Sequence, residues 1–159
     1  MTTVRQAVLA DLPALASLFD SYRQFYGRTP DVGAAESFLR ERFNHGESIL
    51  FLAHGASAPI GFTQLYPSYS SVSLARTFIL NDLFVVASAR RSGIASALLR
   101  AAIDYALSLG AIRVTLNTDR QNTNHPAIYE PDGWKSDRTL YSHDSTHHAH
   151  QLQRTHPDA

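Results

Sequence analysis

The sequence predicts one domain of the α/β (α+β) class, in which helices flank a β-sheet. Strand-like apolar runs and amphipathic helical stretches follow one another along most of the chain, separated by glycine, proline and asparagine. The chain has 159 residues, about the length of one average domain and enough to enclose one hydrophobic core. No internal repeat interrupts this order, so a single domain is expected.

The first quarter of the chain predicts a short strand and two helices. The strand covers Val4 to Val8, and the first helix begins after Asp11, a residue type preferred at helix N-caps. Its apolar side chains recur at three- and four-residue spacing: Leu15, Leu18, Phe19, Tyr22 and Tyr26. Gly27 ends this helix. The second helix covers Ala34 to Phe43, with three apolar residues on one face: Phe38, Leu39 and Phe43.

The middle of the chain predicts an antiparallel hairpin and a buried strand. The runs Ser48 to Ala53 and Ile60 to Tyr66 favour strands, and a turn-rich stretch joins them. A loop rich in serine and tyrosine follows. The next run, Thr77 to Val86, is apolar on both faces except for Asn81 and Asp82, which is typical of a strand in the middle of a sheet.

The last helix-and-strand pattern ends in a polar tail. A long helix is predicted from its apolar face, and Gly110 follows it as a C-cap: Ile94, Leu98, Ala102, Tyr105 and Leu109. A strand over Ala111 to Asn117, a short helix bounded by Pro126 and Pro131, and a strand over Gly133 to Tyr141 complete the domain. Residues 142–159 hold five of the eight histidines and show no apolar periodicity, so we expect a flexible tail after a domain spanning residues 1–141.

Composition argues against several classes of function. The formal net charge is zero, which removes the broad attraction that drives nucleic-acid binding. No apolar run approaches the roughly 18 residues needed to cross a membrane, and the N-terminus lacks the pattern of a signal peptide. The absence of cysteine excludes a thiol nucleophile and fits a cytoplasmic protein. We therefore expect a cytoplasmic protein with no nucleic-acid or membrane partner.

The most informative segment is the strand–turn–helix from Leu83 to Leu99. The turn contains Arg90, Arg91 and Gly93 and leads directly into the start of a helix. Unpaired N–H groups and the positive end of the helix dipole favour an anion at such a place, and phosphate is the natural occupant. The alternative is that Gly93 is an ordinary loop glycine and the two arginines are solvated. The segment lacks the motifs of a P-loop and of a dinucleotide-binding fold.

This segment resembles the GNAT acetyltransferases. Their motif, Arg/Gln-x-x-Gly-x-Gly/Ala after a strand ending Leu-x-Val, matches Arg90 to Ala95 and Leu83 to Val85. A second match lies downstream, where Asn122 is followed seven residues later by Tyr129 and then by Gly133-Trp134. The resemblance covers about residues 3 to 141.

The resemblance implies a twisted mixed sheet, splayed near its middle, with acetyl-CoA in the gap as cosubstrate. It implies that the backbone at the end of one strand pairs with the pantetheine arm and that the loop from Arg91 to Ser96 holds the pyrophosphate. The cofactor-binding residues it implies are Leu83, Phe84, Val85, Arg90, Arg91, Ser92, Gly93, Ile94, Ala95, Ser96, Asn122 and Tyr129. No metal is expected.

The resemblance also implies which groups act as acid, as base and as donor to the thioester. Tyr129 is the candidate acid that protonates the leaving thiolate, and a backbone N–H near Val85 polarises the thioester. Asn81 and Asn117 stand where related enzymes carry a glutamate, so the base is open between Asp82 and a water relay ordered by Asn81 and Tyr66. We expect Tyr66, Asn81 and Asp82 to contact the acceptor, and strand alternation places Asp82 on the face opposite Asn81.

The loop after Tyr66 resembles the branch of GNAT enzymes regarded as histone- or polyamine-type acetyltransferases. This resemblance implies direct acetyl transfer to a primary amine of a small molecule or peptide, and a possible homodimer. Two other functions stay open from the sequence. One is a catalytically degenerate acyl-CoA-binding module, and the other is an interaction protein whose histidine-rich tail binds a partner or a metal.

Overall fold

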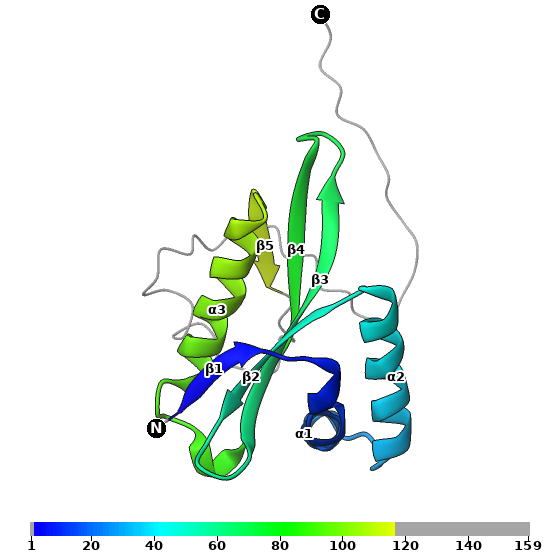
Figure 1. The fold of residues 1–159 in the computed structure, drawn as a ribbon, viewed down its shortest axis with the longest axis vertical. Coiled ribbons are helices and arrows are strands. Elements are labelled where there is room, and N and C mark those ends of the chain that lie inside the picture. Colours follow the sequence, from blue (N-terminus) through cyan, green and yellow to red (C-terminus); the bar gives the residue numbers. More distant parts are fainter. Residues whose placement is uncertain (1, 117–159) are drawn as a thin grey trace, which may run out of the picture.

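The structure is a computed structural model that describes residues 2–116. It consists of a five-stranded sheet with helices on both sides, which confirms the predicted α/β class (Figure 1). Several sequence predictions lie outside the described residues. These are the roles of Asn117, Asn122 and Tyr129, the proline-bounded helix, the last strand and the histidine-rich tail. In the described part of the chain, no helix is long and apolar enough to span a bilayer.

The sheet is mixed, in the order β1-β2-β3-β4-β5. Its first four strands pair antiparallel: β1 (Thr3–Gln6), β2 (Ile49–His54), β3 (Pro59–Ser70) and β4 (Ala75–Val85). The fifth strand, β5 (Arg113–Leu116), runs parallel to β4 because a helix carries the chain back across the sheet between them. The predicted hairpin of β2 and β3 is confirmed.

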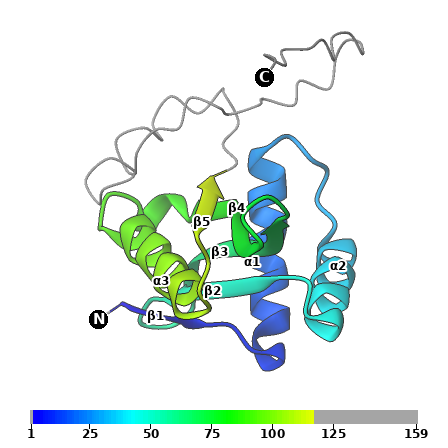
Figure 2. The same cartoon turned by 90° about the horizontal axis from the view of Figure 1, so that it is seen from above.

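Three α-helices cover the two faces of the sheet (Figure 2). Helices α1 (Leu12–Phe25) and α2 (Val32–His45) lie on one face, and α3 (Ile94–Ser108) lies on the other. Two hydrophobic cores result. One contains Phe62 of β3 with α1 and α2, and the other contains Leu65 of β3 with α3. These two strand residues are three apart, an odd separation that sends them to opposite faces.

Residues at the helix ends explain where each helix starts and stops. The Asp31 side chain accepts a hydrogen bond from the Ala34 N–H at 2.9 Å and caps α2. Gly46 ends α2 with a positive φ of 61°. Asp11 precedes α1 as predicted, but its carboxylate does not cap that helix. It instead accepts from the Val8 N–H and pairs with Arg5, which fastens β1 to the start of α1.

Strand β3 is longer than predicted and forms a second hairpin with β4. The segment from Pro67 to Ser70, expected to belong to a loop rich in serine and tyrosine, continues β3 and pairs with β4. Strand β2 pairs with β3 only from Pro59 to Leu65. Among the described residues, the edge of β3 that faces β2 is therefore unpaired at Pro67, and a strand tolerates proline at an unpaired edge.

Strand β4 contains one extra residue, Asn81. Leu65 of β3 pairs with Leu80, and the preceding Gln64 pairs with Asp82, so Asn81 has no partner of its own on β3. Leu80 and Val85 are five residues apart, a separation that would send them to opposite faces of a regular strand. Both pack in the core beside α3 because the bulge shifts the alternation.

The bulge also makes one prediction wrong. Alternation was expected to separate the side chains of Asn81 and Asp82. In the structure the Asn81 Nδ2 donates a hydrogen bond to the Asp82 Oδ1 at 3.1 Å. The two side chains are therefore neighbours at the kink in the strand.

Candidate functional site

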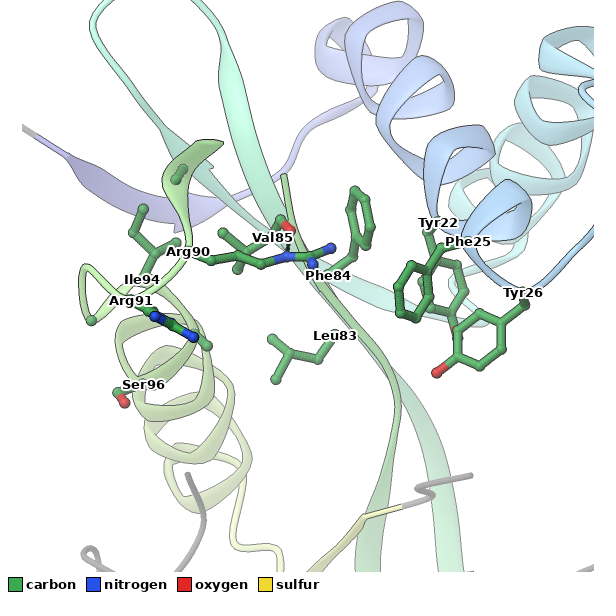
Figure 3. A pocket seen from close by; sticks show the side chains of 13 residues that line it. Tyr22, Phe25, Tyr26, Leu83, Phe84, Val85, Arg90, Arg91, Ile94 and Ser96 are labelled. Atoms are coloured by element: carbon green, nitrogen blue, oxygen red, sulfur yellow. Dashed lines mark hydrogen bonds between the residues drawn. The ribbon is translucent and has the colours of Figure 1, made fainter. Parts of the chain in front are cut away.

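A cleft of about 790 Å³ opens between the end of α1, the end of β4 and the start of α3 (Figure 3). Its lining residues come from these three elements and the loop before α3: Tyr22, Phe25, Tyr26, Leu83, Phe84, Val85, Ala89, Arg90, Arg91, Gly93, Ile94, Ala95 and Ser96. All the predicted cofactor residues that the structure describes are in this set, except Ser92. The cleft thus gathers residues from both the strand and the loop that the sequence singled out.

The loop before α3 is shaped by two residues with positive φ. Arg91 has φ 63° and Gly93, the N-cap of α3, has φ 77°. The Ser92 hydroxyl donates to the Ala89 carbonyl at 2.6 Å, so its side chain serves the turn and does not line the cleft. A left-handed conformation costs a residue such as arginine about 1–2 kcal/mol. Strain of this kind is often kept at binding sites.

Arg90 connects the two sides of the cleft. Its Nε donates a hydrogen bond to the Val85 carbonyl at 3.0 Å, at the end of β4. Its guanidinium carbon lies 5.5 Å from the ring centre of Phe25 on α1, a cation–π distance. Arg90 therefore lines the cleft and also holds the end of the strand.

The side of the cleft formed by α1 is aromatic. We call Tyr22, Phe25, Tyr26 and Phe84 the aromatic wall, since their rings contact one another at 5.1–6.5 Å between centroids. Figure 3 shows Tyr22 and Phe25 of α1, and Tyr26 just after it, across the cleft from Arg91 and Ser96. Phe25 and Tyr26 are 55% and 43% exposed although they are large and apolar. Their exposure leaves ring surface available to a ligand.

A buried polar network lies behind the aromatic wall. The Gln64 Nε2 donates to the Asp82 Oδ2 at 2.7 Å and to the Tyr66 hydroxyl oxygen at 2.9 Å. Asp82 is 5% exposed and Gln64 is fully buried. Burial raises the pKa of the Tyr22 hydroxyl well above its usual range, and the charge of Asp82 and a hydrogen bond to it raise that pKa further.

The same network affects Tyr66. Burial, followed by the nearby charge of Asp82, raises the pKa of Tyr66 to about 12. The three residues predicted to contact the acceptor, Tyr66, Asn81 and Asp82, are thus brought together. None of them is among the lining residues of the cleft, and Tyr22 connects them to it.

Sequence reasoning missed Gln64. The signal was a long polar side chain in the predicted strand from Ile60 to Tyr66, where burial requires a hydrogen-bonding partner. The partner, Asp82, lies directly opposite on β4. Among residues 2–116, no group of three histidine or acidic side chains could hold a metal ion.

The two ends of the cleft differ in charge. At one end, Arg91 and the N-terminus of α3 favour an anion. At the other end, the carboxylate of Asp82 lies behind aromatic rings whose faces are electron-rich. The arrangement suits a ligand with phosphate at one end and a reactive group near the end of β4.

Comparison with known proteins agrees with this geometry. A family model described as the acetyltransferase (GNAT) family matches residues 14–133. The uncharacterized N-acetyltransferase YhfO of Bacillus subtilis (strain 168) is 46% identical over 134 residues, which cover 84% of this chain and 90% of YhfO.

Solved structures have the same fold. A probable acetyltransferase, 34% identical, superposes with a TM-score of 0.81 and covers 96% of this chain and 99% of its own. A predicted acetyltransferase from Clostridium acetobutylicum, solved with acetyl-CoA, has a TM-score of 0.72 at 14% identity. It covers 93% of this chain and 100% of its own. At that identity the likeness concerns the fold alone.

Proposed function

This chain belongs to the GNAT acetyltransferase family, and from that premise we propose that it moves the acetyl group of acetyl-CoA directly to a primary amine of a small molecule or peptide. Acetyl-CoA-dependent acetyl transfer is general in the family, and the chain is an N-acetyltransferase at that level. The observation that carries the proposal is the single cleft that joins the end of β4, the loop before α3 and the aromatic wall. We propose a cytoplasmic location, supported by the lack of cysteine.

In this proposal the pantetheine arm lies along the end of β4. Among the described residues, β5 pairs with β4 only from Thr77 to Leu80, which leaves the backbone of Leu83 to Val85 without a strand on that side. The Val86 N–H donates to the Ile60 carbonyl on β3. Since successive N–H groups of a strand point to opposite edges, the Val85 N–H points to the open edge. It is the proposed donor to the thioester oxygen.

The pyrophosphate is proposed to lie over residues 91–96. The N–H groups of the first turn of α3 have no partner within the helix, and the dipole adds a positive charge there. A Cβ on Gly93 would meet no atom within 4 Å, so the surface above this helix end is open. The charge of Arg91 and this open surface both fit a phosphate group.

The transfer requires a neutral amine and a proton for the leaving thiolate. A primary amine has a pKa near ~10.4, so it arrives largely as an ammonium ion and must lose a proton. Both oxygens of Asp82 already accept hydrogen bonds and the group is buried. We therefore propose that water beside Asn81 and Tyr66 takes this proton, and that Tyr129 protonates the thiolate.

The experiment is a transfer assay on the full chain. Purified protein, acetyl-CoA and a panel of polyamines, amino acids, aminoglycosides and lysine peptides are combined, and free thiol is measured. Amine-dependent thiol release with a matching acetylated product is the expected result. Tight acetyl-CoA binding without thiol release for any amine would instead identify a non-catalytic acyl-CoA-binding module.

A further inference from the structure

Asp82 is a buried carboxylate for which the structure provides no cation. Its side chain is 5% exposed, and no ion pair within residues 2–116 includes it. Buried charges in proteins are normally paired because an uncompensated charge in a low-dielectric interior is costly. Within the described residues, a buried carboxylate without an ion-pair partner is therefore an unusual feature.

The hydrogen bonds around Asp82 fit its ionised form. The Oδ1 accepts from the Asn81 amide at 3.1 Å, and the Oδ2 accepts from the Gln64 amide at 2.7 Å. Amide NH₂ groups can only donate, so each of these two oxygens must act as an acceptor. The Tyr22 hydroxyl is a further partner. Three uncharged partners hold the carboxylate in place without neutralising its charge.

Among the residues that the structure describes, two arginines lie in this region, and both have other partners. Arg42 affects Tyr66 electrostatically, but its guanidinium pairs with Glu41 and Glu47. Arg90 bonds the Val85 carbonyl and rests on Phe25. The Arg90–Phe25 contact also shows that the aromatic wall binds a cation.

Tyr22 lies between this charge and the cleft. Its ring is part of the aromatic wall, and its hydroxyl bonds to Asp82 behind the wall. A ligand held against Tyr22 and Phe84 would therefore feel both the electron-rich ring faces and the carboxylate. A cationic group of the acceptor is favoured there. An anionic group beside the reacting amine is repelled, whether that amine is protonated or neutral.

We propose that Asp82 determines acceptor specificity: the acceptor end of the cleft takes amines that carry no carboxylate beside the reacting nitrogen, and it discriminates against free amino acids. The inference rests on the proposed acetyl transfer. In this proposal Asp82 determines specificity through its charge and does not act as the general base that accepts the amine proton.

The test uses acceptors that differ only in that carboxylate. The first series is tyramine, tyrosinamide and tyrosine, and the second is agmatine, argininamide and arginine. In each series the amide matches the acid in size but lacks its negative charge. For the wild-type enzyme we expect kcat/KM for the amide to exceed that for the acid at least tenfold.

Variants separate charge from shape. Asp82→Asn should reduce the amide-to-acid ratio at least fivefold, with the acetyl-CoA Kd within twofold of wild type. Tyr22→Phe, which removes a hydrogen bond but no charge, should keep the ratio within twofold. Glu36→Gln is the control, since it removes a surface carboxylate that pairs with Arg40 on α2, away from the cleft. It should change nothing.

If Asp82→Asn melts too low to assay, the double variant Gln64→Leu/Asp82→Leu replaces the buried bonded pair together, which can be nearly neutral for stability. The Asn81 amide loses its bond to Asp82 in this variant, but that residue is only half-buried. If the wild-type enzyme uses the amide and the acid with kcat/KM values within twofold of each other, the proposal is wrong. An unchanged ratio in a folded variant that lacks the carboxylate would also overturn it.

Failure of acetyl transfer itself would appear differently. Thermal melts with tyramine and tyrosine detect binding without turnover. If tyramine stabilises the wild type but not Asp82→Asn, and no acceptor releases thiol, the cation site stands and the proposed transfer fails. If neither binding nor turnover occurs, both ideas are wrong.

Discussion

A Cβ atom on Gly61 would lie 2.9 Å from the backbone carbonyl oxygen of Phe84, closer than real Cβ atoms approach. These residues belong to β3 and β4 at the point where β4 reaches the cleft. The same Cβ would stand 3.3 Å from the Leu98 side chain of α3. Glycine at this position therefore sets how closely the two strands and α3 pack beneath the site.

Gly61→Ala should destabilise the protein. The added methyl group meets backbone, which cannot move aside as the end of a flexible side chain can, and overpacking of this kind typically costs about 1–3 kcal/mol. Urea unfolding should show a lower midpoint with an unchanged m-value. Gly33→Ala is the matched control, because its Cβ would meet only the Asp31 Oδ1, at 3.7 Å, in a helix. That change should raise stability by about 0.4–1 kcal/mol. Equal midpoints for the two variants would contradict the packing argument.

Gly93→Glu should weaken acetyl-CoA binding. A carboxylate placed about 4 Å from the pyrophosphate would cost about 1–4 kcal/mol of repulsion, which is a roughly 5- to 1000-fold loss of affinity. Gly110→Glu is the control, since Gly110 also has a positive φ, 73°, and an open Cβ direction, but follows the other end of α3. Isothermal titration with acetyl-CoA should separate the two variants. Equal affinities in folded proteins would mean that the phosphate site is elsewhere.

Acid should remove the stability contributed by Asp11. Hydrogen bonds from Arg5, opposed by partial burial and aided by the Val8 N–H, lower the pKa of Asp11 from 3.8 to about 2. A lowered folded-state pKa adds stability that is fully present above the unfolded value and disappears as pH falls through the folded value. The difference in unfolding free energy between wild type and Asp11→Asn should be constant from pH 5 to 7 and shrink between pH 4 and 2. A difference independent of pH over that window would exclude this ion pair as its source.

Much of the described fold could be predicted because its signals are local. The buried face of α3 at Ile94, Leu98 and Ala102 and the pairing of β2 with β3 follow from spacing and turn residues within short windows. The sequence also marks the segment from Leu83 to Ser96, since a strand, a glycine and a helix start are adjacent in it.

The network behind the aromatic wall could not be predicted in the same way. Period-two alternation assigns Asn81 and Asp82 to opposite faces, and no sequence pattern marks the inserted residue of a bulge. Gln64 and Tyr22 reach Asp82 only through the pairing of β3 with β4 and the packing of α1 on the sheet. These are tertiary relationships between residues far apart in the chain.

Tyr129→Phe tests the proposed acid, a residue outside the described part of the chain, whose role rests on its spacing from Asn122. The change removes one hydroxyl and keeps the ring, so acetyl-CoA affinity and thermal stability should be close to wild type. A thiolate with a pKa near ~8.5 can take its proton from a tyrosine with a pKa near ~10 only if the two are hydrogen-bonded. General acid assistance is worth about 10²–10⁴-fold, so turnover at saturating acetyl-CoA and amine should fall by that order. Loss of turnover should shrink for acyl donors with more acidic thiols, which need less help to leave. A rate within about threefold of wild type, under conditions where chemistry limits turnover, would mean that water protonates the thiolate and that Tyr129 has no catalytic role.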